Sequence, residues 1–191
     1  INSFQIMGHY DTLISKRRAT RAPSAPKTTL LLNLTRELIF RAEYDPAYPI
    51  PVGLNLSSWS ADRKPMVNWI EDELHIKYQT PSRIARRWVA EDRLTLMLDG
   101  LDEVDESYRE GCVSAINAYR EDHGFVDIVI CSRTVEYQAL MNRLMLNGAI
   151  RIEPLTEAQI QPYLKTLGES GERIQRLIAN DAGLHDLARS P

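Results

Sequence analysis

Cysteine, clustered histidine and long apolar runs are scarce in this sequence, and each shortage excludes a class of function. The two cysteines, Cys112 and Cys131, lie far apart without CxxC spacing, which indicates neither a disulfide framework nor a zinc site. We interpret both as small core side chains. The four histidines are scattered and form no metal-ligand pattern. No apolar run approaches the roughly 18 residues of a transmembrane helix, and no signal peptide is visible. We therefore expect a cytoplasmic protein without a membrane segment.

The chain also lacks a strong charge of either sign. It has 23 basic and 26 acidic residues and a formal net charge of -3, which gives no reason to expect direct binding to nucleic acid. With 191 residues, 43% of them hydrophobic, the chain is long enough for one sizeable core and a small second subdomain. Its helical pattern continues to the last residues, and we interpret the chain as a fragment of a longer protein.

A regular pattern is missing from residues 1–26. The first 14 residues mix apolar and polar side chains without a clear period, and residues 16–26 are basic and rich in proline. Such a composition is typical of a flexible segment. We therefore assign residues 1–26 to an irregular or disordered N-terminal arm.

The most informative stretch is an apolar run that ends in acidic residues. Leu94–Leu98 is uninterrupted by polar alternation, which predicts a strand buried on both faces in the middle of a parallel sheet. Asp99 follows, at the carboxyl edge where open α/β sheets bind ligands. Gly100 permits a turn, and Asp102 and Glu103 add two carboxylates. Because neighbouring acids repel each other, the pattern indicates a cation, and Mg²⁺ held by a carboxylate and by substrate phosphates is the natural candidate.

These residues resemble the Walker B segment of P-loop NTPases. The variant, an apolar run followed by Asp, a small residue, an apolar residue, Asp and Glu, marks the NACHT family of signal-transducing STAND NTPases. The resemblance implies that Asp99 helps to hold Mg²⁺, and that Asp102 and Glu103 support ATP hydrolysis by positioning water. Gly100 takes the place where many other P-loop ATPases carry a catalytic glutamate. A solvated acidic turn after a strand is the alternative interpretation.

A second resemblance lies at Lys27-Thr28-Thr29, which is followed by a leucine-rich helix and is similar to the end of a Walker A loop. It implies that Lys27, Thr28 and Thr29 bind the phosphates of ATP, and that Thr28 also contacts Mg²⁺. That loop normally needs glycines, because its backbone N–H groups must wrap the phosphates. Each hydrogen bond lost to a charged oxygen is worth roughly 1.5–3 kcal/mol, about tenfold or more in affinity.

In this chain the three glycine positions fall on Arg21, Ser24 and Pro26, so the Walker A loop is degenerate. Two interpretations stay open. One is a genuine degenerate site that binds nucleotide weakly or not at all. The other is that residues up to about 26 are translated out of frame, since glycine-rich codons read in a shifted frame tend to give Arg, Ala and Pro. If no single shift of the underlying DNA restores a glycine-rich loop after an apolar strand, the second interpretation fails.

Ile128–Cys131 predicts another buried strand, which stops at Ser132 and Arg133. An arginine at the same edge as Asp99 is placed to offset the charge that develops in phosphoryl transfer. The pair matches the sensor 1 position of the NACHT pattern, so the resemblance implies that Arg133 detects the γ-phosphate. A surface arginine after a strand is the alternative interpretation.

The remaining elements follow from periodicity and turn residues. Period-two alternation predicts an edge strand near residues 50–56, where Pro51 is tolerated. Apolar residues at helical spacing predict helices, and a last short apolar run predicts a strand. The helices are expected over residues 28–44, 65–78, 80–89, 106–122 and 135–146, and the strand over residues 149–152.

Beyond residue 153 the pattern is helical. Thr156 and Gln159 make a capping box, and Pro162 lies inside the helix so begun, where proline favours a kink. The expected buried face of the following helices consists of Ile174, Leu177, Ile178, Leu184 and Leu187. This pattern resembles the small helical subdomain that follows the sheet in NACHT proteins, in which a proline matching Pro191 approaches the nucleotide base.

These observations predict an α/β fold, and the resemblance specifies a P-loop NTPase three-layer sandwich with a parallel central sheet. The NTPase core is expected at residues 27–153, and the start of a small helical subdomain at residues 154–191. The resemblance implies an ATP- and Mg²⁺-dependent switch with slow ATPase activity. It also implies self-association through the NTPase domain, sensor and effector regions outside this chain, and a role in bacterial defence signalling. The alternative is a catalytically inactive NACHT-like scaffold that does not bind nucleotide.

Overall fold

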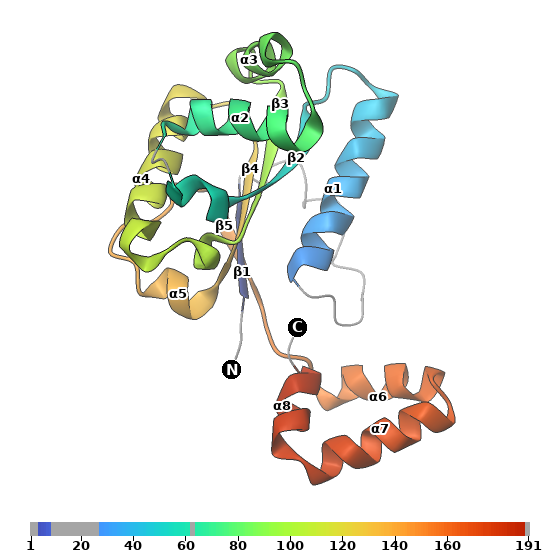
Figure 1. The fold of residues 1–191 in the computed structure, drawn as a ribbon. Coiled ribbons are helices and arrows are strands. Elements are labelled where there is room, and N and C mark those ends of the chain that lie inside the picture. Colours follow the sequence, from blue (N-terminus) through green and yellow to red (C-terminus); the bar gives the residue numbers. More distant parts are fainter. Residues whose placement is uncertain (1–3, 9–26, 62–63, 190–191) are drawn as a thin grey trace.

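The computed structural model describes residues 4–8, 27–61 and 64–189. Its centre is a five-stranded sheet in the order β2-β3-β4-β1-β5, with helices on both faces (Figure 1). The strands are β1 (Phe4–Gly8), β2 (Ile50–Asn55), β3 (Leu94–Asp99), β4 (Ile128–Arg133) and β5 (Gly148–Ile152). Strands β2, β3 and β4 pair in parallel, whereas β1 is antiparallel to both β4 and β5. The protein therefore has an α/β fold with a three-strand parallel sheet.

Strands β3 and β4 are buried on both faces, as their apolar sequences predict. On β3, Leu96 and Leu98 join the larger core cluster, while Met97 joins the smaller cluster on the opposite face. On β4, Ile130 and Val129 divide between the same two clusters. Because successive side chains point into two apolar layers, neither strand shows polar alternation.

Helices lie on both faces of this sheet. Helix α1 (Lys27–Tyr44) covers one face, where Leu31 and Leu38 pack against the smaller cluster. Helices α2 (Met66–Tyr78) and α4 (Glu106–Asp122) lie over the other face, and α3 (Ser82–Ala90) packs against α2 (Figure 1). The four helices predicted in these regions are confirmed. Within the described ranges, no helix combines the length and the apolar character needed to cross a bilayer.

Strand β2 is an edge strand, as its alternation and Pro51 predict. The hydroxyl of Tyr78, at the end of α2, accepts a hydrogen bond from the N–H of Gly53 at 3.0 Å and donates one to its carbonyl oxygen at 2.9 Å. Lys77 Nζ donates to the same carbonyl at 2.7 Å. These side chains satisfy backbone groups that an edge strand leaves unpaired, which protects the edge against pairing with another chain.

Strand β1 lies within the segment predicted as an irregular arm, whose residues 9–26 are outside the described part of the chain. It fills the gap between β4 and β5, with Phe4 opposite Arg133 on one side and Ile152 on the other. Pairing on both sides orders a sequence whose own alternation is weak. The prediction of a parallel central sheet is thus confirmed for β2, β3 and β4 and wrong for β1.

Helix α5 (Thr134–Gln138) is much shorter than the helix predicted over residues 135–146. Side chains of α4 bind the backbone of the remaining segment instead. The Glu110 carboxylate accepts hydrogen bonds from the N–H groups of Met141 and Asn142, at 2.6 and 3.1 Å. Asn117 donates to the carbonyl of Arg143 and accepts from the N–H of Met145, both at 2.9 Å. These tertiary hydrogen bonds replace the helical ones, so the apolar spacing alone was misleading.

The C-terminal region contains three helices, α6 (Glu157–Thr166), α7 (Glu169–Asn180) and α8 (Ala182–Arg189). The predicted capping box is present at the start of α6, where the side-chain oxygen of Gln159 accepts from the N–H of Thr156 at 2.9 Å. Pro162 lies inside α6. Helices therefore form where the sequence predicted them.

The predicted buried face of these last helices is largely wrong. Leu177 is 59% exposed and Leu187 69% exposed, and Ile174 and Leu184 are also exposed. Ile178 packs partly against the small cluster formed by Leu155, Ile160 and Leu164. Three short helices enclose little volume, so their periodicity produces an apolar face without burying all of it.

We predict that Gly171→Ala unpacks this helical region. A Cβ atom at Gly171 would lie 1.9 Å from the carbonyl oxygen of Leu164, so α7 has to move away from α6, at a cost of about 1–3 kcal/mol. Thermal unfolding followed by circular dichroism, together with proteolysis of residues 154–189, measures the effect. The control is Gly111→Ala in α4, where a Cβ atom only touches the Trp59 ring at 3.7 Å, and where alanine favours the helix by up to about 1 kcal/mol. Equal stability of the two variants would contradict the prediction.

Candidate functional site

Polar residues end three neighbouring strands at one edge of the sheet. They are Asn55 on β2, Asp99 on β3 and Arg133 on β4, and Asn55 lies opposite Asp99 in the parallel register. The first turn of α1 lies toward this same edge (Figure 1). The N-terminus of α1 and the carboxyl ends of the parallel strands therefore face the same side of the sheet, which is the side where open α/β sheets bind ligands.

A tight turn follows Asp99 and determines where the next acids point. Gly100 adopts φ 78°, a left-handed conformation that favours glycine, and it immediately precedes the short 3-10 helix η2 (Leu101–Glu103). The N–H of Glu103 donates to the carbonyl of Gly100 at 2.9 Å. Leu101 is fully buried in the core and anchors the turn, so Asp102 and Glu103 are held at the sheet edge.

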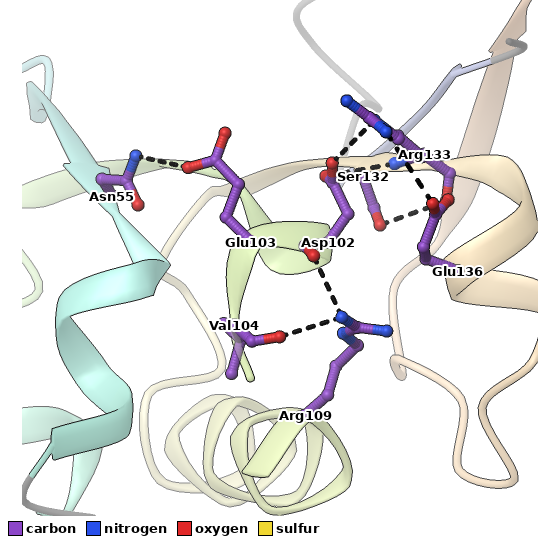
Figure 2. A network of polar contacts seen from close by, with 8 residues as sticks. All are labelled: Asn55, Asp102, Glu103, Val104, Arg109, Ser132, Arg133 and Glu136. Carbon is purple, nitrogen blue, oxygen red and sulfur yellow. Dashed lines mark hydrogen bonds and ion pairs between the residues drawn. The ribbon is translucent and has the colours of Figure 1, made fainter. Parts of the chain in front are cut away.

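The carboxylate of Asp102 turns toward β4 (Figure 2). It accepts a hydrogen bond from the backbone N–H of Arg133 at 3.2 Å and pairs with Arg133 Nε at 3.2 Å. The Asp102 side chain is only 4% exposed, whereas that of Arg133 is 52% exposed. Arg133 also lies 4.0 Å from a Glu136 carboxylate oxygen at the start of α5. Asp102 is thus covered by Arg133 and fixes the direction of the guanidinium group.

Arg109 supports the turn from below. Its guanidinium group donates to the carbonyl oxygen of Asp102 at 3.0 Å and to that of Val104 at 2.9 Å (Figure 2). Arg109 belongs to the first turn and a half of α4, so this side chain ties the helix to the carbonyl groups of the acidic turn. The backbone of Asp102 is therefore held by α4 while its carboxylate is held by β4.

Glu103 turns the opposite way, toward β2. Its Oε2 atom accepts a hydrogen bond from Asn55 Nδ2 at 3.0 Å (Figure 2). Glu103 is exposed to solvent, whereas Asp99 is half-buried. Consecutive acids in η2 thus reach different strands, and only Glu103 presents its carboxylate to solvent.

The structure brings some of the predicted site residues together and separates others. Asp102 and Arg133 are in contact, and Asp99 lies on the strand between Asn55 and Arg133. Among the described residues, no three His, Cys, Asp or Glu side chains come together as a metal site. The expected Mg²⁺ site needs only Asp99 and Thr28 from the protein and stays a prediction. Lys27, Thr28 and Thr29 open α1, but their side chains are outside the description, as is all of Pro191.

Two residues of this site were missed by the sequence analysis. Asn55 is a polar residue at the end of a predicted strand, as Asp99 is. It was overlooked because it belongs to no recognised motif. Arg109 gives no local signal, since an arginine in a helix is ordinarily solvated. Both act through bonds between segments distant in sequence, which only the fold brings together.

The two cysteines are confirmed as core residues. Cys112 and Cys131 are both free and buried. Burial raises the pKa of Cys112 to about 12, so its thiol stays protonated at neutral pH and is a poor nucleophile.

Comparison with protein-family models, with curated proteins and with solved structures finds no match for this chain.

We predict that the charge of Asp105, which caps α4 directly after the acidic turn, stabilises the fold only above acidic pH. Hydrogen bonds from the Ser107 hydroxyl and then from the Ser107 N–H lower the pKa of Asp105. A lowered pKa gives a contribution that is present above the unfolded-state value, about 3.9, and lost as pH falls through the folded-state value. Urea unfolding should show the native chain more stable than Asp105→Asn at pH 7, with the difference disappearing near pH ~2. A difference that persists unchanged at low pH would contradict this.

We also predict that Arg133→Ala destabilises the protein by roughly 1.5–3 kcal/mol, because it leaves the buried carboxylate of Asp102 without its cationic partner. A double-mutant cycle with Asp102→Asn, measured by urea unfolding, should give a coupling between the two side chains. Lys64→Ala is the control, since the Lys64–Asp72 pair is exposed on both sides, at 42% and 52%, and should cost less than about 1 kcal/mol. Equal effects of Arg133→Ala and Lys64→Ala would rule out a special role for the Asp102–Arg133 pair.

Proposed function

We propose that this chain is the nucleotide-binding domain of a NACHT-type STAND NTPase, with the P-loop three-layer fold, and that it acts as an ATP-dependent oligomerisation switch with slow hydrolysis. One observation carries the proposal. Asp99 and Arg133 end adjacent parallel strands, and α1 begins toward the same edge of the sheet. This is the arrangement that the Walker B and sensor 1 resemblances require.

The start of α1 suits a phosphate group. The first turn of α1 contains no acidic residue and begins with Lys27, so the partial positive charge of the helix N-terminus is not offset there. Asp99 lies at the neighbouring strand end, half-buried, and offers the hard oxygen ligand that Mg²⁺ prefers. Lys27, Thr28 and Thr29 would hold the phosphates, with Thr28 and Asp99 on the Mg²⁺ ion, which neutralises phosphate charge when bound.

We assign the other residues different roles on the basis of their contacts and exposure. Asp102 is covered by Arg133, so its proposed function changes from positioning water to directing the guanidinium of Arg133. Arg133 remains half-exposed and keeps donors for a terminal phosphate. Glu103 has the exposed carboxylate of η2 and is the residue suited to orient and deprotonate water. Pro191 is retained as the proposed contact to the base.

A specific observation favours the second candidate, a NACHT-like scaffold that binds no nucleotide. In a P-loop the strand before the loop ends where the helix begins. Here β1 runs antiparallel to β4, and Gly8 pairs with Val129 rather than with Arg133, so β1 ends away from the start of α1. The usual glycine positions are also occupied by Arg21, Ser24 and Pro26.

Isothermal titration with Mg²⁺ and ATP tests the proposal, and we expect binding that is weak but measurable at millimolar nucleotide. Binding should strengthen by about tenfold or more when Arg21, Ser24 and Pro26 are all replaced by glycine, because each regained phosphate hydrogen bond adds roughly 1.5–3 kcal/mol. Glu103→Gln should abolish any turnover and leave binding unchanged.

The controls separate the two candidates. Glycine at the same three positions combined with Asp99→Ala should lose the Mg²⁺-dependent part of the gain, since the remaining pocket lacks its metal ligand. No binding by the native chain or by the glycine variant would overturn the switch and favour the scaffold. Turnover that survives Glu103→Gln would remove the catalytic role of Glu103 alone.

A further inference from the structure

Asn55 connects the edge strand β2 to the one acid of η2 that faces solvent. It is the last residue of β2, and its Nδ2 atom donates to Glu103 Oε2 at 3.0 Å (Figure 2). The two residues are 48 positions apart in the sequence. A side chain at the end of β2 therefore determines where the Glu103 carboxylate lies.

The orientation of the Asn55 amide is not arbitrary. Its Oδ1 atom accepts a hydrogen bond from the N–H of Ser57 at 2.8 Å, at the start of the short 3-10 helix η1 (Leu56–Ala61). Since the Asn55 oxygen accepts from this backbone N–H, the NH₂ group has to face Glu103. A flipped amide would place its NH₂ group against the Ser57 N–H and its oxygen against the Glu103 carboxylate.

That helix is itself held in place by further bonds. The Ser58 hydroxyl donates to the carbonyl of Asn55 at 3.0 Å and to Glu73 at 2.8 Å, and it accepts from Trp69 Nε1 at 3.0 Å. A hydroxyl has a single hydrogen, so it donates to one of the two acceptors at a time. Through Ser58 and Trp69, the backbone around Asn55 is tied to α2, and the donor that meets Glu103 is rigidly supported.

Gly100 makes room for this contact. A Cβ atom at Gly100 would lie 2.7 Å from Glu103 Oε2 and 3.2 Å from Asn55 Oδ1. The Glu103 carboxylate thus folds back over Gly100, into the space where any other residue at this position would place its side chain. The small residue of the motif is needed for the Asn55–Glu103 contact as well as for the positive φ of the turn.

We propose that Asn55 is a positioning residue for ATP hydrolysis, which holds the Glu103 carboxylate over Gly100 so that its free oxygen is directed at water. This inference rests on the proposed function. Asn55 touches neither water nor nucleotide in this role. It acts by limiting the orientations of a surface glutamate, whose flexible side chain would otherwise sample many rotamers.

Two kinds of variant test the proposal in the whole chain. Asn55→Ser keeps a hydroxyl that can accept from the Ser57 N–H but is too short to reach Glu103. We expect kcat for ATP to fall by about tenfold with KM kept within about twofold, because the nucleotide contacts are untouched. Asn117→Ser is the matched control, since this asparagine also binds backbone groups but lies outside the site, and its kcat should not change.

A stability cycle tests the contact independently of nucleotide. Asn55→Asp should lower Tm by about 2–4 °C, because two carboxylates then face each other while the Ser57 N–H keeps its acceptor. In the double variant Asn55→Asp with Glu103→Gln, the amide at position 103 donates to the carboxylate at position 55. This restores the hydrogen bond and should restore Tm. Additive effects in this cycle, or an unchanged kcat in Asn55→Ser, would overturn the inference while leaving the proposed function intact. Absence of turnover in the native chain would instead overturn the hydrolytic part of the proposed function and, with it, the role of Asn55.

Discussion

The parallel pairing of β3 with β4 is the constraint on which the arrangement of this protein depends. Both strands are buried on both faces, so their apolar runs end only where the chain leaves the core. Because parallel strands point the same way, the polar residues that follow the two apolar runs lie at the same edge of the sheet. Asp99 and Arg133 become neighbours for this reason, and the ion pair between Asp102 and Arg133 follows from it.

The turn after β3 then distributes its acids. Gly100 lets the backbone enter η2 with a positive φ, and Leu101 buries itself beneath the turn. Asp102 and Glu103 are adjacent in the chain but face β4 and β2 respectively. The 3-10 turn thus separates the two carboxylates, and each one has its own hydrogen-bond donor, Arg133 for Asp102 and Asn55 for Glu103. These two contacts offset part of the repulsion between Asp102 and Glu103 that the sequence led us to expect.

The N-terminal strand β1 differs from β2, β3 and β4 in its direction. Strand β1 completes the sheet by antiparallel pairing with β4 and β5, which satisfies their backbone groups as a parallel strand would. The direction of β1 decides whether a strand leads directly into α1. Under the proposed function, the reversed direction of β1 and the lack of glycine at Arg21, Ser24 and Pro26 both predict weak binding of phosphate.

The sequence alone determined the elements whose local pattern and burial agree: β2, β3, β4, helices α1 to α4, and the capped start of α6. It also placed Asp99 and Arg133 at one edge, because strand ends and parallel direction suffice for that. Only the tertiary structure decided the direction of β1, the short α5 held by Glu110 and Asn117, and the partners of Asp102 and Glu103. These features depend on hydrogen bonds and charges between distant segments, and local apolar spacing contains no information about which side chain meets which.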